Sequence, residues 1–194
     1  MGFRIQQIYE QKIDWRGPYV IIANHTSEID IMATLAIVKG RWLFIGKKEL
    51  ARFPVFGFFY KKTNILVDRS SPRSRREVYH RAHLKINEGF GICIYPEGGI
   101  PNTEWRLSPF KPGAFRLAIE SQIPIIPITF VDNKRLFPEE WSAASPGTLR
   151  CVIHKPIQTT GLEESDAHRL RQVAYSIIDK TLEEYGVEGR SQNQ

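Results

Sequence analysis

The sequence predicts an α/β protein with a mixed, mostly parallel central sheet and helices on both faces. Short β-branched and aromatic runs alternate with stretches of helical periodicity, and this alternation is typical of a sheet covered on both sides. Several connections are long enough for a parallel crossover and others are not, which predicts a mixed sheet. With 194 residues and 42% hydrophobic content, the chain can bury one sizeable core. We expect a single domain over residues 1–186 and a disordered tail over 187–194.

Six runs have the composition of buried strands. Each is a short β-branched or aromatic segment bounded by polar or turn-forming residues. The predicted strands are 19–23, 42–46, 65–67, 91–95, 125–131 and 149–153.

Two helices carry clear signals. The first is predicted over 72–88, because Ser71 suits an N-cap, Pro72 suits the first turn and Gly89 suits the C-terminal cap. The second, over 164–185, repeats apolar residues at the spacing of a core-facing stripe, which indicates packing rather than recognition.

The net charge favours anionic partners. The chain has 27 Lys and Arg against 21 Asp and Glu, a formal charge of +6. Phospholipid headgroups, coenzyme phosphates, acidic carrier proteins and nucleic acid all fit such an excess. No helix-turn-helix, zinc-ligand spacing or aromatic RNA-binding signature is found, so nucleic acid is not expected as a partner.

The apolar runs are too short to cross a membrane. The longest, 123–131, contains two prolines and falls far below the roughly 20 residues that a spanning helix needs. Residues 1–14 lack the apolar core and cleavage site of a signal peptide. Cys93 and Cys151 lie inside apolar strand-like runs, which is typical of buried structural thiols in a reducing cytoplasm. We therefore expect a cytoplasmic protein whose membrane contact is peripheral.

The first predicted strand ends at the most informative segment, which contains His25 and Asp30. On one helix, a separation of five residues would place the two side chains about 140° apart, too far for a hydrogen bond. Ser27 as N-cap leaves His25 in the preceding turn, from which it can fold back over the first helical turn to Asp30. Two other interpretations remain open. Ser27 and Asp30 also fit a capping box, and a single histidine is often structural.

The wider pattern resembles the glycerolipid acyltransferases, a family that includes the 1-acylglycerol-3-phosphate acyltransferases of phospholipid biosynthesis. Four blocks match in order, over roughly residues 18 to 131. They are Asn24-His25 with Asp30, Gly46-Lys47-Lys48-Glu49-Leu50 (followed by Pro54 and Gly57) running on to Val67-Asp68-Arg69, Tyr95-Pro96-Glu97-Gly98, and Ile123-Pro124-Ile125-Ile126-Pro127-Ile128.

The resemblance implies a glycerol-3-phosphate acyltransferase-like domain and an enzyme that moves a fatty acyl group from acyl-CoA or acyl carrier protein to the hydroxyl of a lysophospholipid. The first candidate acceptor is 1-acyl-sn-glycerol 3-phosphate, which would give phosphatidic acid. His25 would act as general base, with Asp30 fixing its tautomer. We expect no metal and no bound cofactor, because thioester and hydroxyl can react directly when both are held in line.

By the same resemblance, the acceptor would be bound by Asn24, Lys48, Arg69, Glu97 and Gly98, with Lys48 and Arg69 near its phosphate. Solvated surface charge is the alternative for these two basic residues.

The third block departs from the family, which usually continues Glu-Gly with Thr or Ser and then Arg, whereas here Gly99-Ile100 follows. The acceptor's phosphate is therefore in doubt. One explanation is that Arg106 or Lys111, from the following loop, replaces the missing arginine. The other is that the acceptor has a different headgroup and is another lysolipid or an amino-acid lipid.

Two basic segments predict surface contacts. The aromatic cluster 52–62, flanked by Arg52, Lys61 and Lys62, is either ordinary core or a lipid-facing wall at an anionic membrane surface, on the cytoplasmic face. The run 69–76 suits coenzyme phosphates or an acidic carrier protein, or is a solvated helix start. A catalytically silent lipid-binding module is the alternative to an enzyme. The intact Asn24-His25 and Asp30 argue against it.

Overall fold

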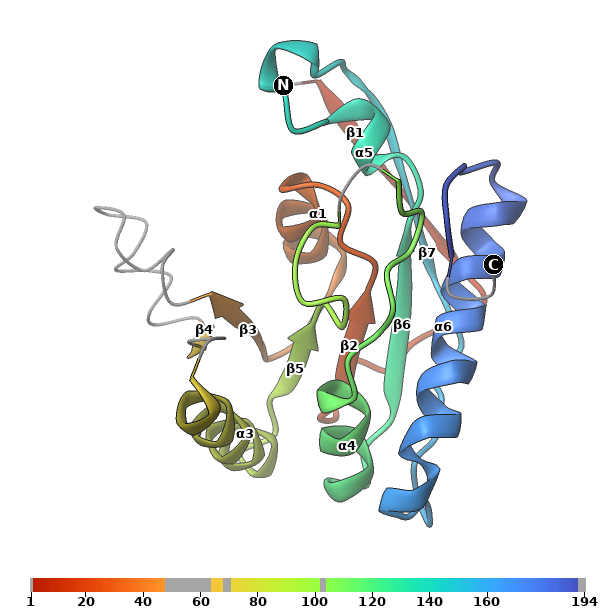
Figure 1. Ribbon diagram of the computed structural model, residues 1–194. Helices are drawn as coiled ribbons and strands as arrows, with labels where there is room; N and C mark the ends of the chain where they lie inside the picture. Colours follow the sequence, from red (N-terminus) through yellow and green to blue (C-terminus); the bar gives the residue numbers. More distant parts are fainter. Residues whose placement is uncertain (1, 48–63, 68–70, 102–103, 192–194) are drawn as a thin grey trace.

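A seven-stranded sheet forms the centre of the protein (Figure 1). The computed structural model describes residues 2–47, 64–67, 71–101 and 104–191. The strand order is β1-β7-β6-β2-β5-β3-β4. β7 runs antiparallel to β6, and every other pair of neighbours is parallel. The mixed, mostly parallel sheet is therefore confirmed. The strands are β1 (Phe3–Tyr9), β2 (Val20–Ala23), β3 (Trp42–Lys47), β4 (Asn64–Val67), β5 (Gly91–Ile94), β6 (Ile125–Phe130) and β7 (Gly147–Ile153).

Helices cover both faces of this sheet. Side chains of successive strand residues point to opposite faces, so Val20 and Ile22 join one core cluster while Ile21 and Ala23 join another. The first cluster packs under three helices and the second under α1. The helices are α1 (Ile29–Ile37), α3 (Pro72–Asn87), α4 (Gly113–Glu120), α5 (Asn133–Leu136) and α6 (Ala167–Glu184), with 3₁₀ turns η2 (Trp141–Ala143) and η3 (Glu164–Asp166).

The predicted elements agree with the structure to within a few residues. All six predicted strands are present. The Ser71 hydroxyl caps α3 by accepting from the Ser74 backbone N–H at 3.2 Å, and Gly89 follows the helix with φ +84°. The last helix begins at Ala167, after the 3₁₀ turn η3.

Strand β1 was not predicted. Its sequence, FRIQQIY, places two glutamines side by side, so the apolar residues do not alternate over enough positions to indicate a strand. Only Phe3, Ile5 and Ile8 are partly buried. The strand forms because it pairs along its whole length with β7, a long-range partner that local sequence does not reveal.

The C-terminal segment differs from the predicted disordered tail over residues 187–191. The backbone of Arg190 pairs with the loop before α4, donating to the Glu104 carbonyl at 2.8 Å and accepting from the Arg106 N–H at 2.9 Å. Val187 packs against the core cluster that α6 also joins. The segment is ordered because its backbone finds these partners. Residues 192–194 lie outside the described part.

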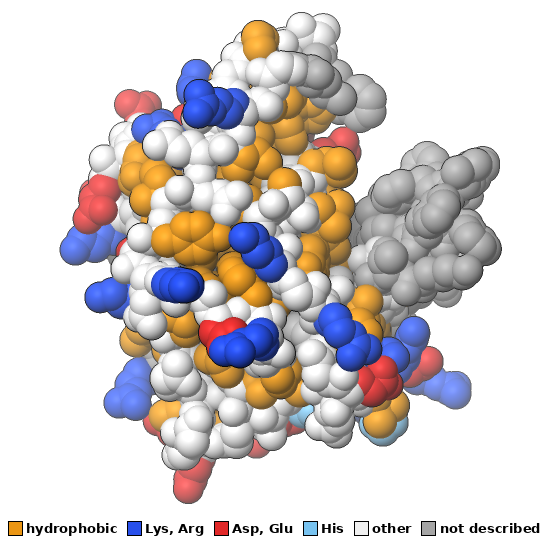
Figure 2. All heavy atoms as spheres, turned by 180° about the vertical axis from the view of Figure 1, so that it is seen from behind, with side chains coloured by type: hydrophobic (Ala, Val, Ile, Leu, Met, Phe, Trp, Pro, Cys, Tyr) orange, Lys and Arg blue, Asp and Glu red, His pale blue; other side chains and the backbone are white. Residues whose placement is uncertain are grey.

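The outer face of α1 is apolar. Met32 and Leu35 are 63% and 53% exposed, and Ala36 is exposed beside them. Figure 2, which views the protein from behind, shows hydrophobic side chains gathered in the middle of this side with Lys and Arg around them. Among the described residues, no helix combines the length and the hydropathy needed to span a membrane.

Candidate active site

The site lies where two neighbouring strands end. β2 and β5 are parallel and paired, so their carboxyl ends meet at one edge of the sheet. β2 leads into His25 and the first turn of α1, and β5 leads into Tyr95 and Glu97. Ligands of open α/β sheets bind at this kind of edge.

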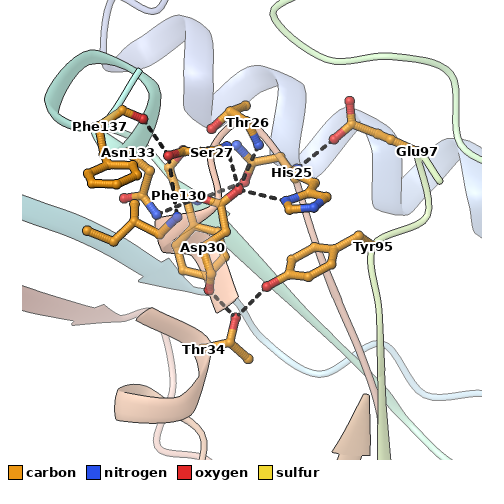
Figure 3. A network of polar contacts seen from close by, with 12 residues as sticks. His25, Thr26, Ser27, Asp30, Thr34, Tyr95, Glu97, Phe130, Asn133 and Phe137 are labelled. Atoms are coloured by element: carbon orange, nitrogen blue, oxygen red, sulfur yellow. Dashed lines mark hydrogen bonds and ion pairs between the residues drawn. The ribbon is translucent and has the colours of Figure 1, made fainter. Parts of the chain in front are cut away.

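His25 and Asp30 are joined directly. The His25 Nδ1 lies 3.0 Å from the Asp30 Oδ2 (Figure 3). The Asp30 side chain is fully buried, whereas that of His25 is 14% exposed. His25 sits in the turn before α1 and folds back over its first turn, as the spacing predicted.

The carboxylate of Asp30 makes both contacts that the sequence left open, one to His25 and one to the backbone of the turn. Its Oδ2 also accepts from the backbone N–H groups of Thr26 at 2.7 Å and Ser27 at 2.9 Å. Its Oδ1 accepts from the Asn133 Nδ2 at 2.7 Å. The contacts that order the turn therefore also aim the carboxylate at the histidine.

Ser27 is not the N-cap of α1, contrary to the prediction. The residue at that position is Glu28, which makes no side-chain cap hydrogen bond. The Ser27 hydroxyl donates instead to the Phe137 carbonyl at 2.5 Å. The Ser27 oxygen also accepts from the Ile29 N–H, at 3.4 Å. The Asp30 carboxylate takes the shorter bonds from the Thr26 and Ser27 N–H groups, and the serine hydroxyl ties the turn to the segment after β6.

Tyr95 supports the His25 ring. The two rings stack with centroids 4.2 Å apart and planes 14° apart. The Thr34 hydroxyl donates to the Asp30 carbonyl at 2.8 Å, so the Tyr95 hydroxyl, 2.9 Å from the Thr34 oxygen, is the donor to it. Burial raises the pKa of Tyr95 well above 10, which keeps this donor proton in place. The ring is thus fixed by Asp30 at Nδ1 and by Tyr95 below, and its Nε2 has no hydrogen bond to any residue that the structure describes.

Glu97 holds the backbone of His25. Its Oε1 accepts from the His25 N–H at 2.7 Å and its Oε2 from the Ser108 N–H at 2.8 Å. The residue is 7% exposed, and burial raises the pKa of its carboxyl to about 7. The structure thus brings Glu97 next to the histidine through the main chain, with both oxygens in use.

The Asn24 side chain bonds to the backbone at the end of β6. Its amide donates to the Phe130 carbonyl at 2.9 Å and accepts from the Phe130 N–H at 2.8 Å. Asn24 is fully buried. This pair of bonds fixes the residue before His25 to the end of β6.

Gly98 lies against a lysine. It has φ +82°, and a Cβ there would collide with the end of the Lys111 side chain. Arg106, the other basic residue considered for the missing arginine, is directed to α6, where its Nε donates to the Asp179 Oδ1 at 2.9 Å. The structure therefore brings Lys111, and not Arg106, to the turn that follows Glu97.

Some predicted residues fall outside the described part of the chain. Lys48 and Arg69, predicted near the acceptor phosphate, are among them, as is the aromatic cluster 52–62. These assignments remain predictions.

A hollow of about 200 Å³ adjoins the His25 turn. Its walls carry two carboxylates, from Glu28 and Glu139, both exposed. The lining residues are Ser27, Glu28, Ile100, Phe137, Pro138 and Glu139.

The cysteines are buried free thiols, as predicted. Burial raises the pKa of Cys151 to about 12 and raises that of Cys93 as well. A nucleophilic cysteine needs a lowered pKa, so neither thiol is suited to carry an acyl group.

Comparison with known proteins identifies the family. Residues 4–131 match the family model described as Acyltransferase. The chain belongs to the acyltransferase family. The matched range contains His25, Asp30 and Glu97, and the predicted enzyme class is confirmed.

Named relatives of this acyltransferase come from distant organisms. It is 29% identical to human 1-acyl-sn-glycerol-3-phosphate acyltransferase beta, over 95% of this chain and 69% of that protein. It is 28% identical to the 1-acyl-sn-glycerol-3-phosphate acyltransferase of Haemophilus influenzae, over 93% of this chain and 78% of that protein. A chloroplastic relative from Brassica napus is 31% identical, but only 41% of its length is covered.

A solved structure has the same fold. The crystal structure of the 1-acyl-sn-glycerophosphate (LPA) acyltransferase PlsC from Thermotoga maritima superposes with a TM-score of 0.76 and 22% identity. The match covers 95% of this acyltransferase and 74% of that chain.

Sequence reasoning missed three contributors to the site, namely Thr34, Tyr95 and Asn133. Tyr95 had been noted only as part of a matching block. Asn133 had a usable signal, because it is a polar residue just after the predicted strand 125–131, and that strand is parallel to β2. Its side chain therefore emerges at the same edge of the sheet as His25.

Proposed function

We propose that this acyltransferase transfers a fatty acyl group from an acyl thioester to the free hydroxyl of 1-acyl-sn-glycerol 3-phosphate, giving phosphatidic acid. The observation that carries the proposal is the His25 ring, held by Asp30 at Nδ1 with Nε2 left open at the strand edge. The names of the human and Haemophilus influenzae relatives support the choice of acceptor.

The reaction needs one base. The His25 Nε2 takes the proton of the acceptor hydroxyl as its oxygen attacks the thioester carbonyl, and a carbon–oxygen bond forms. When the carbon–sulfur bond breaks, the departing thiolate takes the proton from the imidazolium. Asp30 stabilises that cation, and general-base catalysis of this kind contributes on the order of 10²- to 10⁴-fold.

The acceptor phosphate has a candidate cation in Lys111. Because Gly98 has no side chain, the lysine lies directly over the turn that follows Glu97. We expect Lys111→Ala to raise KM for the phosphate-bearing acceptor with a smaller change in kcat. Lys155→Ala, at an exposed lysine near β7, is the matched control. An unchanged KM in Lys111→Ala would reject the assignment.

A second acceptor class is favoured by the hollow beside Ser27. Its two carboxylates, Glu28 and Glu139, suit a headgroup with a positive charge, as in an amino-acid lipid or another amino-bearing lysolipid. Faster turnover of such an acceptor than of 1-acyl-sn-glycerol 3-phosphate, reversed in Glu139→Gln, would support this class. No preference in the wild type would reject it.

The membrane surface that presents the acceptor is proposed to meet the outer face of α1. Ile31, Met32, Leu35 and Ala36 form one stripe of the helix, at whose end lies the exposed Lys39. An apolar stripe with basic residues at its edge suits an anionic bilayer, here the cytoplasmic leaflet.

Vesicle flotation tests this surface. Met32→Asp with Leu35→Asp should abolish binding to anionic vesicles. Val173→Asp, which alters a 45% exposed valine on α6, should leave binding unchanged. If the double variant still binds and Phe58→Asp with Phe59→Asp does not, the contact belongs to the aromatic cluster 52–62 instead.

The decisive experiment is acylation of 1-acyl-sn-glycerol 3-phosphate, with the product followed by mass spectrometry. Acyl-CoA and acyl carrier protein are each supplied as donor, to wild type and to His25→Ala. Product that is lost in the folded variant supports the reaction and the base together. No product from any lysolipid with either donor would reject the proposed activity in favour of a lipid-binding module.

A further inference from the structure

Asn133 is the one side chain from outside the His25 turn that bonds to the Asp30 carboxylate among the described residues. We infer that Asn133 is a positioning residue of the active site, holding the carboxylate so that its other oxygen faces His25. The inference rests on the proposed function, because it assumes that His25 and Asp30 catalyse acyl transfer. Asn133 is fully buried, and its Nδ2 donates to the Asp30 Oδ1 at 2.7 Å (Figure 3).

The bond is placed where the carboxylate would otherwise be free to turn. The last torsion of an aspartate is broad and roughly two-fold. The other three donors, from Thr26, Ser27 and His25, all bond to Oδ2. Of the residues that the structure describes, Asn133 alone bonds to Oδ1, so it sets the plane of the carboxylate and with it the direction of the bond to the His25 Nδ1.

The amide itself is oriented for this purpose. Its Oδ1 is buried and has no hydrogen-bond partner among the described residues. Turning the amide over would bring that oxygen against the Asp30 oxygen, so the NH₂ group must face Asp30. A buried unpaired oxygen costs stability, and an apolar side chain at this position would avoid the cost. Packing alone therefore does not explain an asparagine here.

The segment that carries Asn133 is tied on both sides. The Arg150 side chain donates to both carboxylate oxygens of Asp132 at 2.7 Å, which anchors the start of α5 to β7. The Asn133 carbonyl accepts from the Phe137 N–H at 2.8 Å, and the Phe137 carbonyl accepts from Ser27. The second tie, from Asn133 through Phe137 to Ser27, fastens the segment to the His25 turn itself and keeps the amide at Asp30.

The test replaces the donor by an isosteric acceptor. In Asn133→Asp two carboxyl groups face each other and share one proton when it is present. We expect kcat to fall by roughly 10- to 100-fold at the pH of the wild-type maximum, with both KM values little changed. The loss should shrink toward acidic pH, where the introduced carboxyl keeps a proton to donate. Asn133→Leu, which offers no donor at any pH, should lose activity without this recovery.

Asp132→Asn is the matched control. It alters the adjacent residue and weakens the contact to Arg150 without touching Asp30, so it should lower Tm and leave kcat and the pH profile of the folded enzyme unchanged. A wild-type kcat and pH profile in Asn133→Asp would overturn the inference, as would an equal loss of kcat in Asp132→Asn.

A spectroscopic measurement separates this inference from the proposed function. The proton on the His25 Nδ1, observed by NMR, should shift in Asn133→Asp and remain in place in Asp132→Asn. Activity does not enter this measurement. An enzyme that is inactive with every donor and acceptor but shows the shift would reject the proposed reaction alone, and an active enzyme without the shift would reject the role of Asn133.

Discussion

Two histidines of this protein have similar contacts but are proposed to have different roles. His25 follows β2 and His154 follows β7. Each bonds to a carboxylate through Nδ1, His25 to Asp30 at 3.0 Å and His154 to Glu10 at 2.8 Å. At the second nitrogen they differ. The His154 Nε2 bonds to the Thr129 hydroxyl at 2.7 Å, whereas the His25 Nε2 has no partner among the described residues.

The comparison teaches that a carboxylate beside a histidine does not make a catalytic site. The His154 side chain is 1% exposed, and its two bonds connect β6 to the segment after β1, so it fastens the edge strand. The His25 side chain is 14% exposed, and its Nε2 has no hydrogen bond to any residue in the described part of the chain. An unoccupied, reachable nitrogen is what distinguishes the proposed base from the structural residue.

Replacing each histidine by alanine gives the largest expected contrast. His25→Ala should lower kcat/KM by roughly 10²- to 10⁴-fold because the base is lost. His154→Ala should leave kcat/KM within a few-fold at a temperature where the protein is folded. Equal losses in the two folded variants, measured by steady-state acylation, would show that the open nitrogen of His25 has no special role.

The two carboxylates provide the next contrast. Asp30→Asn places an amide nitrogen in a cluster of N–H donors and removes the partner of the imidazolium, so we expect kcat to fall by roughly 10²-fold or more. Glu10→Gln makes the same chemical change beside His154 and should leave kcat unchanged. Measurement of kcat against pH in both variants checks the result. A wild-type kcat in Asp30→Asn would contradict the proposed catalytic pair of His25 and Asp30.

We expect replacement of His154 to lower the free energy of unfolding. His154→Ala removes two hydrogen bonds and leaves Thr129 without its partner, at a cost of about 1–3 kcal/mol in the free energy of unfolding.

Burial lowers the pKa of His154, so the unfolded chain binds more protons. The stability that depends on neutral His154 is therefore present above its unfolded pKa of about 6.5 and is lost as pH falls. Urea denaturation from pH 5 to 8 should show this slope in wild type and not in His154→Ala.

Glu97, on the His25 side, should give a slope of the opposite sign. Burial raises the pKa of its carboxyl to about 7, so the folded protein binds more protons than the unfolded chain between the unfolded value near 4.5 and 7. Stability should fall as pH rises through that window, by up to about 1 kcal/mol per pH unit. The difference in unfolding free energy between wild type and Glu97→Gln measures it, and a difference that does not vary with pH would contradict the assignment.

Local patterns predicted most of the sheet and the core of the site. The spacing of His25, Ser27 and Asp30 led to the fold-back geometry, although Glu28 rather than Ser27 is the N-cap of the helix and the Ser27 hydroxyl donates to the Phe137 carbonyl. What remained hidden depends on distant partners. β1 forms only against β7, and Asn133 reaches Asp30 across a separation of 103 residues. His154 carried no local sign that both of its nitrogens would be occupied.

The bonding of Asp30 also limits where a proton can travel. An ionised carboxylate has about four acceptor positions, and four N–H or ring nitrogen groups surround this one. Because the Asp30 side chain is also fully buried, we do not expect it to relay a proton to solvent. In the proposed reaction the histidine gives up the proton through the same nitrogen that took it, and the base that receives the proton is the thiolate that leaves. Each turnover would therefore end when the departing thiolate takes the proton from His25. Release of the thiol and regeneration of the neutral base would then occur in the same step.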